Sequence, residues 1–133
     1  MYLLDTNVCI KLLNGNAIAV TKKLAQQEPE DICLCTVVQF ELYYGAYRGS
    51  KTTQNLSKLT RFFDQFLILP FDESAAKIAG QIRSQLNKLG TPIGVYDLQI
   101  AAIALANNLT LVTHNTREFG RVDGLNYEDW EIE

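Results

Sequence analysis

The fold is decided by the stretch Leu3-Leu4-Asp5-Thr6-Asn7, in which an apolar segment ends in a carboxylate. The apolar residues 1–4 predict a buried strand, and the polar residues that follow predict a turn into a helix. In a parallel α/β sheet, ligands bind beyond the carboxyl ends of the strands. Asp5 is therefore expected at the edge of the sheet where such a fold has its active site.

Three later segments place a carboxylate or an amide in a comparable position. Glu41 falls in the second turn of a helix predicted after a strand, and its neighbours are apolar or aromatic. Asp97 falls in the first turn of its helix, on the same face as small apolar residues. The segments are Phe40-Glu41-Leu42, the run 93–102 (IGVYDLQIAA) around Asp97, and Thr113-His114-Asn115-Thr116-Arg117-Glu118-Phe119.

The order of elements predicts one α/β domain over residues 1–133, with a mostly parallel sheet of four to five strands covered by helices on both faces. We expect Thr36 and Asp72 to cap the helices that follow them, because side-chain oxygens at that position accept bonds from free N–H groups. An apolar stripe from Ala75 to Leu89 should face the core. The expected strands are 1–4, 31–35, 66–71, 109–113 and 126–130, and the expected helices are 7–13, 17–27, 37–47, 52–63, 73–89 and 95–106.

Several carboxylates in one pocket repel one another unless a cation compensates them. No lysine or arginine neighbours Asp5, Glu41 or Asp97 in the sequence. Mg²⁺ or Mn²⁺, which prefer oxygen ligands, would supply the charge and could drive the hydrolysis of a phosphodiester. Taken singly, each acid has a plainer interpretation, since Asp5 could simply cap a helix and Asp97 could complement a helix dipole. His114 is interpreted as a loop residue or as a residue that supports the metal ligands, and not as a general base.

Composition gives weaker guidance. The net charge of −3 does not suggest a polyanionic partner, so any affinity for nucleic acid would need local cations, for which the candidates are Arg48, Lys51, Lys58, Arg61, Arg117 and Arg121. Tyr43, Tyr44 and Tyr47 could stack bases, but their helical spacing fits packing at least as well. Cys9, Cys33 and Cys35 are interpreted as buried thiols. With no signal peptide or membrane span in view, we expect a cytoplasmic protein.

The four segments that contain Asp5, Glu41, Asp97 and Asn115 resemble the four motifs of the PIN-domain ribonucleases, and more narrowly those of the VapC toxins of type II toxin–antitoxin systems. The similarity covers essentially the whole chain in order. It implies a twisted, mostly parallel sheet in a three-layer fold and a Mg²⁺- or Mn²⁺-dependent endoribonuclease. Asp5, Glu41 and Asp97 carry over as metal ligands and catalytic acids. At the fourth motif many relatives have an aspartate, whereas this chain has Asn115, followed by Glu118, and both are carried over as catalytic candidates.

The resemblance also implies partners. These are a structured RNA substrate such as transfer RNA, a cognate antitoxin that inserts into the active-site groove, a second copy in a homodimer, and operator DNA bound only through the antitoxin. Two other hypotheses stay open at this stage. The chain could be a nuclease-silent module of the same fold that binds an antitoxin or RNA, or a flavodoxin-like phosphate receiver. The phosphate-receiver hypothesis is the weaker one, because no acidic pair follows the first strand.

Overall fold

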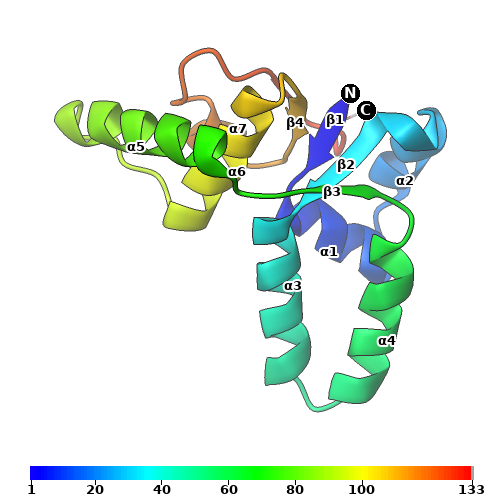
Figure 1. The fold of residues 1–133 in the computed structure, drawn as a ribbon. Coiled ribbons are helices and arrows are strands. Elements are labelled where there is room, and N and C mark those ends of the chain that lie inside the picture. Colours follow the sequence, from blue (N-terminus) through cyan, green and yellow to red (C-terminus); the bar gives the residue numbers. More distant parts are fainter. Residues whose placement is uncertain (133) are drawn as a thin grey trace.

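The computed structural model describes residues 1–132 as a five-stranded sheet with helices packed on it (Figure 1). The strand order is β3-β2-β1-β4-β5, and every neighbouring pair is parallel, as the sequence predicts. The strands are β1 Tyr2–Leu4, β2 Ile32–Cys35, β3 Leu67–Leu69, β4 Thr110–Val112 and β5 Tyr127–Glu128. The helices are α1 Thr6–Asn14, α2 Ile18–Ala25, α3 Thr36–Arg48, α4 Thr52–Phe63, α5 Glu73–Lys88, α6 Val95–Ala106 and α7 Thr116–Phe119, with a short 3₁₀ turn at Pro29–Asp31.

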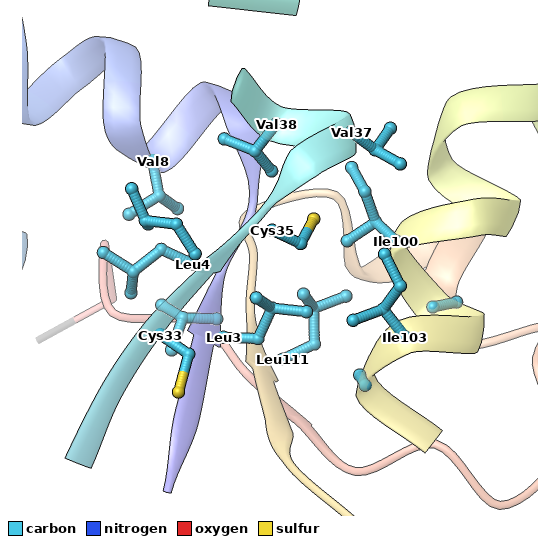
Figure 2. Packing of buried hydrophobic residues seen from close by; sticks show 14 of the residues in the cluster. Leu3, Leu4, Val8, Cys33, Cys35, Val37, Val38, Ile100, Ile103 and Leu111 are labelled. Atoms are coloured by element: carbon cyan, nitrogen blue, oxygen red, sulfur yellow. The ribbon is translucent and has the colours of Figure 1, made fainter. Parts of the chain in front are cut away.

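The three inner strands are covered on both faces, which is why their buried residues are all apolar. Successive residues of a strand point to opposite faces. Figure 2 shows Leu3 and Leu111 on the side of α6, where Ile100 and Ile103 lie, whereas Leu4 lies beside Val8 of α1. The sheet is thus the middle layer of a three-layer fold.

The chain builds the sheet outward from β1 in two directions. It adds β2 and β3 on one side and then returns to add β4 and β5 on the other. A crevice forms beyond the carboxyl ends of the strands where this direction reverses, and ligands of parallel sheets bind there. Asp5, directly after β1, and Thr113, directly after β4, occupy that position.

Helices α3 and α4 form a two-helix arm that extends away from the sheet, joined by the turn at residues 49–51 (Figure 1). We call residues 36–63 the α3–α4 arm. Among residues 1–132, no helix is both long enough and apolar enough to cross a membrane.

The structure corrects three local expectations. Thr36 does not cap α3 but is its first residue, and its hydroxyl instead accepts a hydrogen bond from the Phe71 N–H at 3.2 Å. Leu89 is 73% exposed, because α5 ends at Lys88 and Leu89 has left the helical stripe. Helix α7 was not predicted, since four residues are too few to show a helical period. The Asp72 cap is confirmed, with Ala75 N–H donating to it at 3.0 Å.

Candidate active site

Asp5 lies directly after β1, where the strand order reverses, and is only 5% exposed. Its Oδ1 accepts a hydrogen bond from the Val8 N–H at 3.0 Å, so it caps α1. The buried Thr113 hydroxyl also bonds to this carboxyl group. Burial raises the pKa of Asp5, and these two hydrogen bonds only partly offset the effect. Asp5 therefore caps a helix and also presents a buried carboxylate, so its two interpretations do not exclude each other.

Glu41 reaches the same crevice from α3. The Thr6 hydroxyl, in the first turn of α1, donates to Glu41 Oε1 at 2.7 Å. This bond joins α1 to α3 through two residues that are 35 positions apart in the sequence. Because Thr6 follows Asp5 directly, the bond holds the Glu41 carboxylate beside the end of β1.

Asp97 and Glu118 form a carboxyl pair on the other side of the crevice. Asp97 lies in the first turn of α6 and is hydrogen-bonded to Glu118 of α7. Burial, followed by the bond and charge of Glu118 and the charges of Glu41 and Asp5, raises the pKa of Asp97 to about 7. The bonds that Glu118 makes with Asp97 and Asn115 lower its own pKa. In the protein without a cation, the pair therefore retains a proton up to about pH 7.

Asn115 supports this pair. Its Nδ2 donates to Glu118 Oε2 at 2.9 Å, and its backbone N–H donates to the Thr113 hydroxyl at 3.0 Å. Arg121 and Arg117 lie close enough to Glu118 to lower its pKa further. The fourth sequence segment thus supplies an ionised carboxylate, Glu118, that an amide orients.

The five candidate residues converge in one crevice, and their negative charge is not compensated by ion pairs. Within residues 1–132, Asp5, Glu41 and Asp97 form no salt bridge with any lysine, arginine or histidine. The charge of Glu41 contributes to the raised pKa of Asp5, and the charges of Glu41 and Asp5 contribute to the raised pKa of Asp97, so the three carboxylates lie close together. A donor set made of carboxylate oxygens suits a hard divalent cation, so the crevice could bind one.

A second acidic group lies at the same edge of the sheet, after β5. In the described part of the chain, His114, Asp129 and Glu131 are the group whose metal-ligating atoms all lie within 4.8 Å of one another; the carboxylates of Asp5, Glu41 and Asp97 are more widely spaced. His114 Nδ1 is 2.9 Å from Asp129 Oδ2, and Glu131 pairs with Lys11 of α1. These contacts tie the end of the chain to α1 and to the loop after β4, and Lys11 compensates one of the two carboxylates. His114 is a loop residue, as predicted.

A groove of about 270 Å³ opens beside Glu41, between α1 and the α3–α4 arm. Apolar side chains such as Ile10 and Leu59 line most of it, and Lys58 lies on its wall. Glu41 itself lines the groove, so a chain that lies in it would reach the acidic crevice.

Sequence reasoning identified all five acidic and amide residues that meet here, but not the contacts that hold them. The Thr6–Glu41 and Asp97–Glu118 bonds join residues from different elements, and no local pattern signals them. The approach of Glu131 to Asp5 was also missed, because it depends on where β5 joins the sheet.

Comparisons with a family model, with known proteins and with solved structures all indicate the same family. The model of the PIN domain matches residues 2–125. The tRNA(fMet)-specific endonuclease VapC of Shigella flexneri is 37% identical over 129 residues, which cover 97% of each chain. VapC in the DNA-bound VapBC structure from Salmonella typhimurium superposes with a TM-score of 0.91 at 35% identity and 97% coverage of each chain. VapBC2 from Rickettsia felis, bound to a promoter DNA fragment, gives a TM-score of 0.89 at 36% identity, covering 97% of this chain and 98% of the other. This chain therefore belongs to the PIN-domain family and, within it, to the VapC ribonucleases.

Proposed function

We propose that this chain, as a single domain over residues 1–133, is the toxin of a type II toxin–antitoxin system and cuts RNA with a divalent cation, Mg²⁺ or Mn²⁺. The observation that carries the proposal is the convergence of Asp5, Glu41 and Asp97, without ion-pair partners in the described chain, at the reversal point of the sheet. Membership of the VapC ribonucleases supports the reaction class.

The residues fit a hard cation, and we assign Asp5, Glu41 and Asp97 as its ligands. The raised pKa of Asp97 supports this assignment, because burial and then the neighbouring carboxylates oppose its ionisation, and a bound cation would favour the ionised form. A bound Mg²⁺ or Mn²⁺ would supply a water of lowered pKa and would neutralise charge on the phosphate. Thr6 and Thr113 orient Glu41 and Asp5 from behind, as partners of metal ligands commonly do.

Glu118 and Asn115 are assigned to positioning the attacking water. Glu118 stays ionised because its pKa is lowered, so it can accept a hydrogen bond from that water and aim it at the phosphorus. Asn115 holds Glu118 through its Nδ2 group at 2.9 Å. A neutral amide at this position adds no negative charge, which favours a site with fewer cation ligands than one with an aspartate there.

The substrate and partners are proposed from the relatives. The Shigella flexneri relative is described as specific for tRNA(fMet), so structured RNA, and transfer RNA first, is the substrate class to test. Similar structures are VapBC complexes, two of them bound to DNA, so we propose a cognate antitoxin, a homodimeric toxin, and operator DNA bound through the antitoxin. An antitoxin segment would enter the groove beside Glu41. A cytoplasmic location follows from these partners.

The test is cleavage of purified initiator transfer RNA by the purified protein. We expect cleavage in Mg²⁺ or Mn²⁺ and none in EDTA, and Asp5→Asn should lower the rate by at least about 10²-fold. Asp123→Asn, which changes an exposed acid outside the crevice, is the matched control. If the wild-type protein cuts neither this RNA nor total cellular RNA with either metal, the proposal is wrong.

The nuclease-silent module is the second candidate, and the neutral Asn115 is the observation in its favour. It predicts that titration calorimetry detects no Mg²⁺ or Mn²⁺ binding. It also predicts that growth arrest on expression, if any, persists in Asp5→Asn. The nuclease predicts the opposite result in both experiments.

A further inference from the structure

The α3–α4 arm carries a positive charge although the whole chain is acidic. Residues 36–63 contain four cationic side chains and one carboxylate, a net charge of +3, whereas the full sequence has a net charge of −3. The cations are Arg48, Lys51, Lys58 and Arg61. A projecting arm of this charge attracts a polyanion despite the acidic pI.

At the base of this arm, two aromatic rings lie beside the acidic crevice. Phe40 of α3 and Tyr96 of α6 have ring centroids 5.3 Å apart at an interplanar angle of 64°. Each directly precedes an acid of the crevice, Glu41 or Asp97. Phe40 is 51% exposed and Tyr96 is 45% exposed. The pair thus bridges the two helices that carry these acids.

The pair differs from the aromatic residues that the sequence singled out. Tyr43 packs edge-on against Phe63 and so belongs to the packing between α3 and α4. Tyr44 lies under the Arg48 guanidinium, 5.3 Å from ring centroid to Cζ. In the edge-to-face pair of Phe40 and Tyr96, one ring presents its edge to the other, so the contact itself leaves ring faces uncovered. Uncovered aromatic faces beside a phosphodiester-cleaving site are suited to stacking bases.

We propose that the Phe40–Tyr96 pair stacks an unpaired base of the RNA strand next to the phosphate held at the acidic crevice. The cations of the α3–α4 arm would follow the backbone of the same strand. The inference rests on the proposed ribonuclease function and adds a base-binding position to it. Charge favours RNA over a second copy of the chain as the occupant, because a second copy would bring its own arm of charge +3.

The test measures binding of a 12-nucleotide unpaired RNA that contains one 2-aminopurine, in EDTA so that no cleavage occurs. Phe40→Leu and Tyr96→Leu keep apolar bulk but remove the ring, and each should weaken binding roughly 5- to 150-fold and reduce the quenching of 2-aminopurine. Tyr96→Phe keeps the ring and should bind within about twofold of wild type. The matched control is Tyr127→Leu, which removes a 40% exposed ring from β5, outside the α3–α4 arm, and should bind within about twofold of wild type.

A second variant reports on stacking without removing the ring. Phe40→Trp should show quenched indole fluorescence when RNA binds, against the constant signal of Trp130, which is 3% exposed. Circular dichroism and light scattering check the fold and the oligomeric state of every variant. Leucine variants that bind RNA as wild type does would overturn the inference, and so would an affinity loss that coincides with dissociation of a dimer.

Failure of this inference is distinguishable from failure of the proposed function. RNA cleavage that is insensitive to both leucine variants at subsaturating RNA would refute the stacking position and leave the nuclease standing. Ring-dependent RNA binding by a protein that cuts no RNA would refute the nuclease and leave the stacking position standing.

Discussion

Replacement of Asp97 by asparagine should stabilise the cation-free protein at pH 8 while removing its response to Mg²⁺. Asparagine has nearly the same shape as aspartic acid, and its amide can donate to Glu118 as the protonated Asp97 carboxyl does. The substitution therefore removes the ionisable group and keeps the hydrogen bond.

The size of the stabilisation expected for Asp97→Asn follows from the raised pKa of Asp97. Its pKa is raised from 3.8 to about 7, mainly by burial and by Glu118. A shift of about three units, at 1.36 kcal/mol each, sets a ceiling of about 4 kcal/mol on the cost of ionising Asp97 in the folded protein. Asp97 is only half-buried, so solvent screening reduces this to about 1–2 kcal/mol. For a chain of this length, that corresponds to a rise in Tm of about 3–8 °C.

The contribution of Asp97 to the free energy of unfolding depends on pH. The folded state binds the Asp97 proton more tightly than the unfolded state does, so this stability is fully present below pH 3.8 and is lost as the pH rises through about 7. In EDTA, the free energy of unfolding of the wild type should therefore fall between pH 4 and pH 8 relative to that of Asp97→Asn. At pH 4 the two proteins should be nearly equal.

The assay is thermal unfolding followed by circular dichroism, in EDTA and then in Mg²⁺, with Asp123→Asn as the exposed-acid control. A cation that binds only the folded state raises Tm, so Mg²⁺ should stabilise the wild type and the control but not Asp97→Asn. The reasoning is refuted if Asp97→Asn is no more stable than the wild type at pH 8 in EDTA, or if Mg²⁺ stabilises both proteins equally.

Three further predictions concern the support of the site and the fold. Thr6→Val removes the 2.7 Å bond to Glu41 and should raise the Mg²⁺ concentration needed for half-maximal cleavage by about tenfold, whereas Thr6→Ser should not; an unchanged metal dependence would contradict this. Asp72→Ala removes the cap of α5 and should lower the unfolding free energy measured in urea by about 1 kcal/mol, and Asp72→Asn should restore most of it; equal loss in both variants would contradict capping. Trp130→Ala empties a site that is 3% exposed and should cost about 3–5 kcal/mol in the same measurement, with Trp130→Phe costing less; a loss below about 1 kcal/mol would show that the end of the chain does not support the core.

The local features of this chain were readable from its sequence. Buried strands appear in the sequence as short apolar runs, and Asp5 is recognisable because it is a charged residue directly after such a run. The Asp72 cap and the parallel sheet were predicted and are confirmed. The predictions were wrong where an element was too short to show a pattern, or where a residue bonds to a partner distant in the sequence. Helix α7 is too short to show a period, and Thr36 bonds to Phe71 from another segment instead of capping its own helix.

By itself, the sequence determined which residues could form an acidic site and on which kind of element each would stand. Only the tertiary structure decided which of them meet. The Thr6–Glu41 bond, the proton held between Asp97 and Glu118, and the Phe40–Tyr96 pair all join elements that are distant in the chain. The physical reason is that the distances between such side chains depend on strand order and helix packing, which no short window of sequence contains.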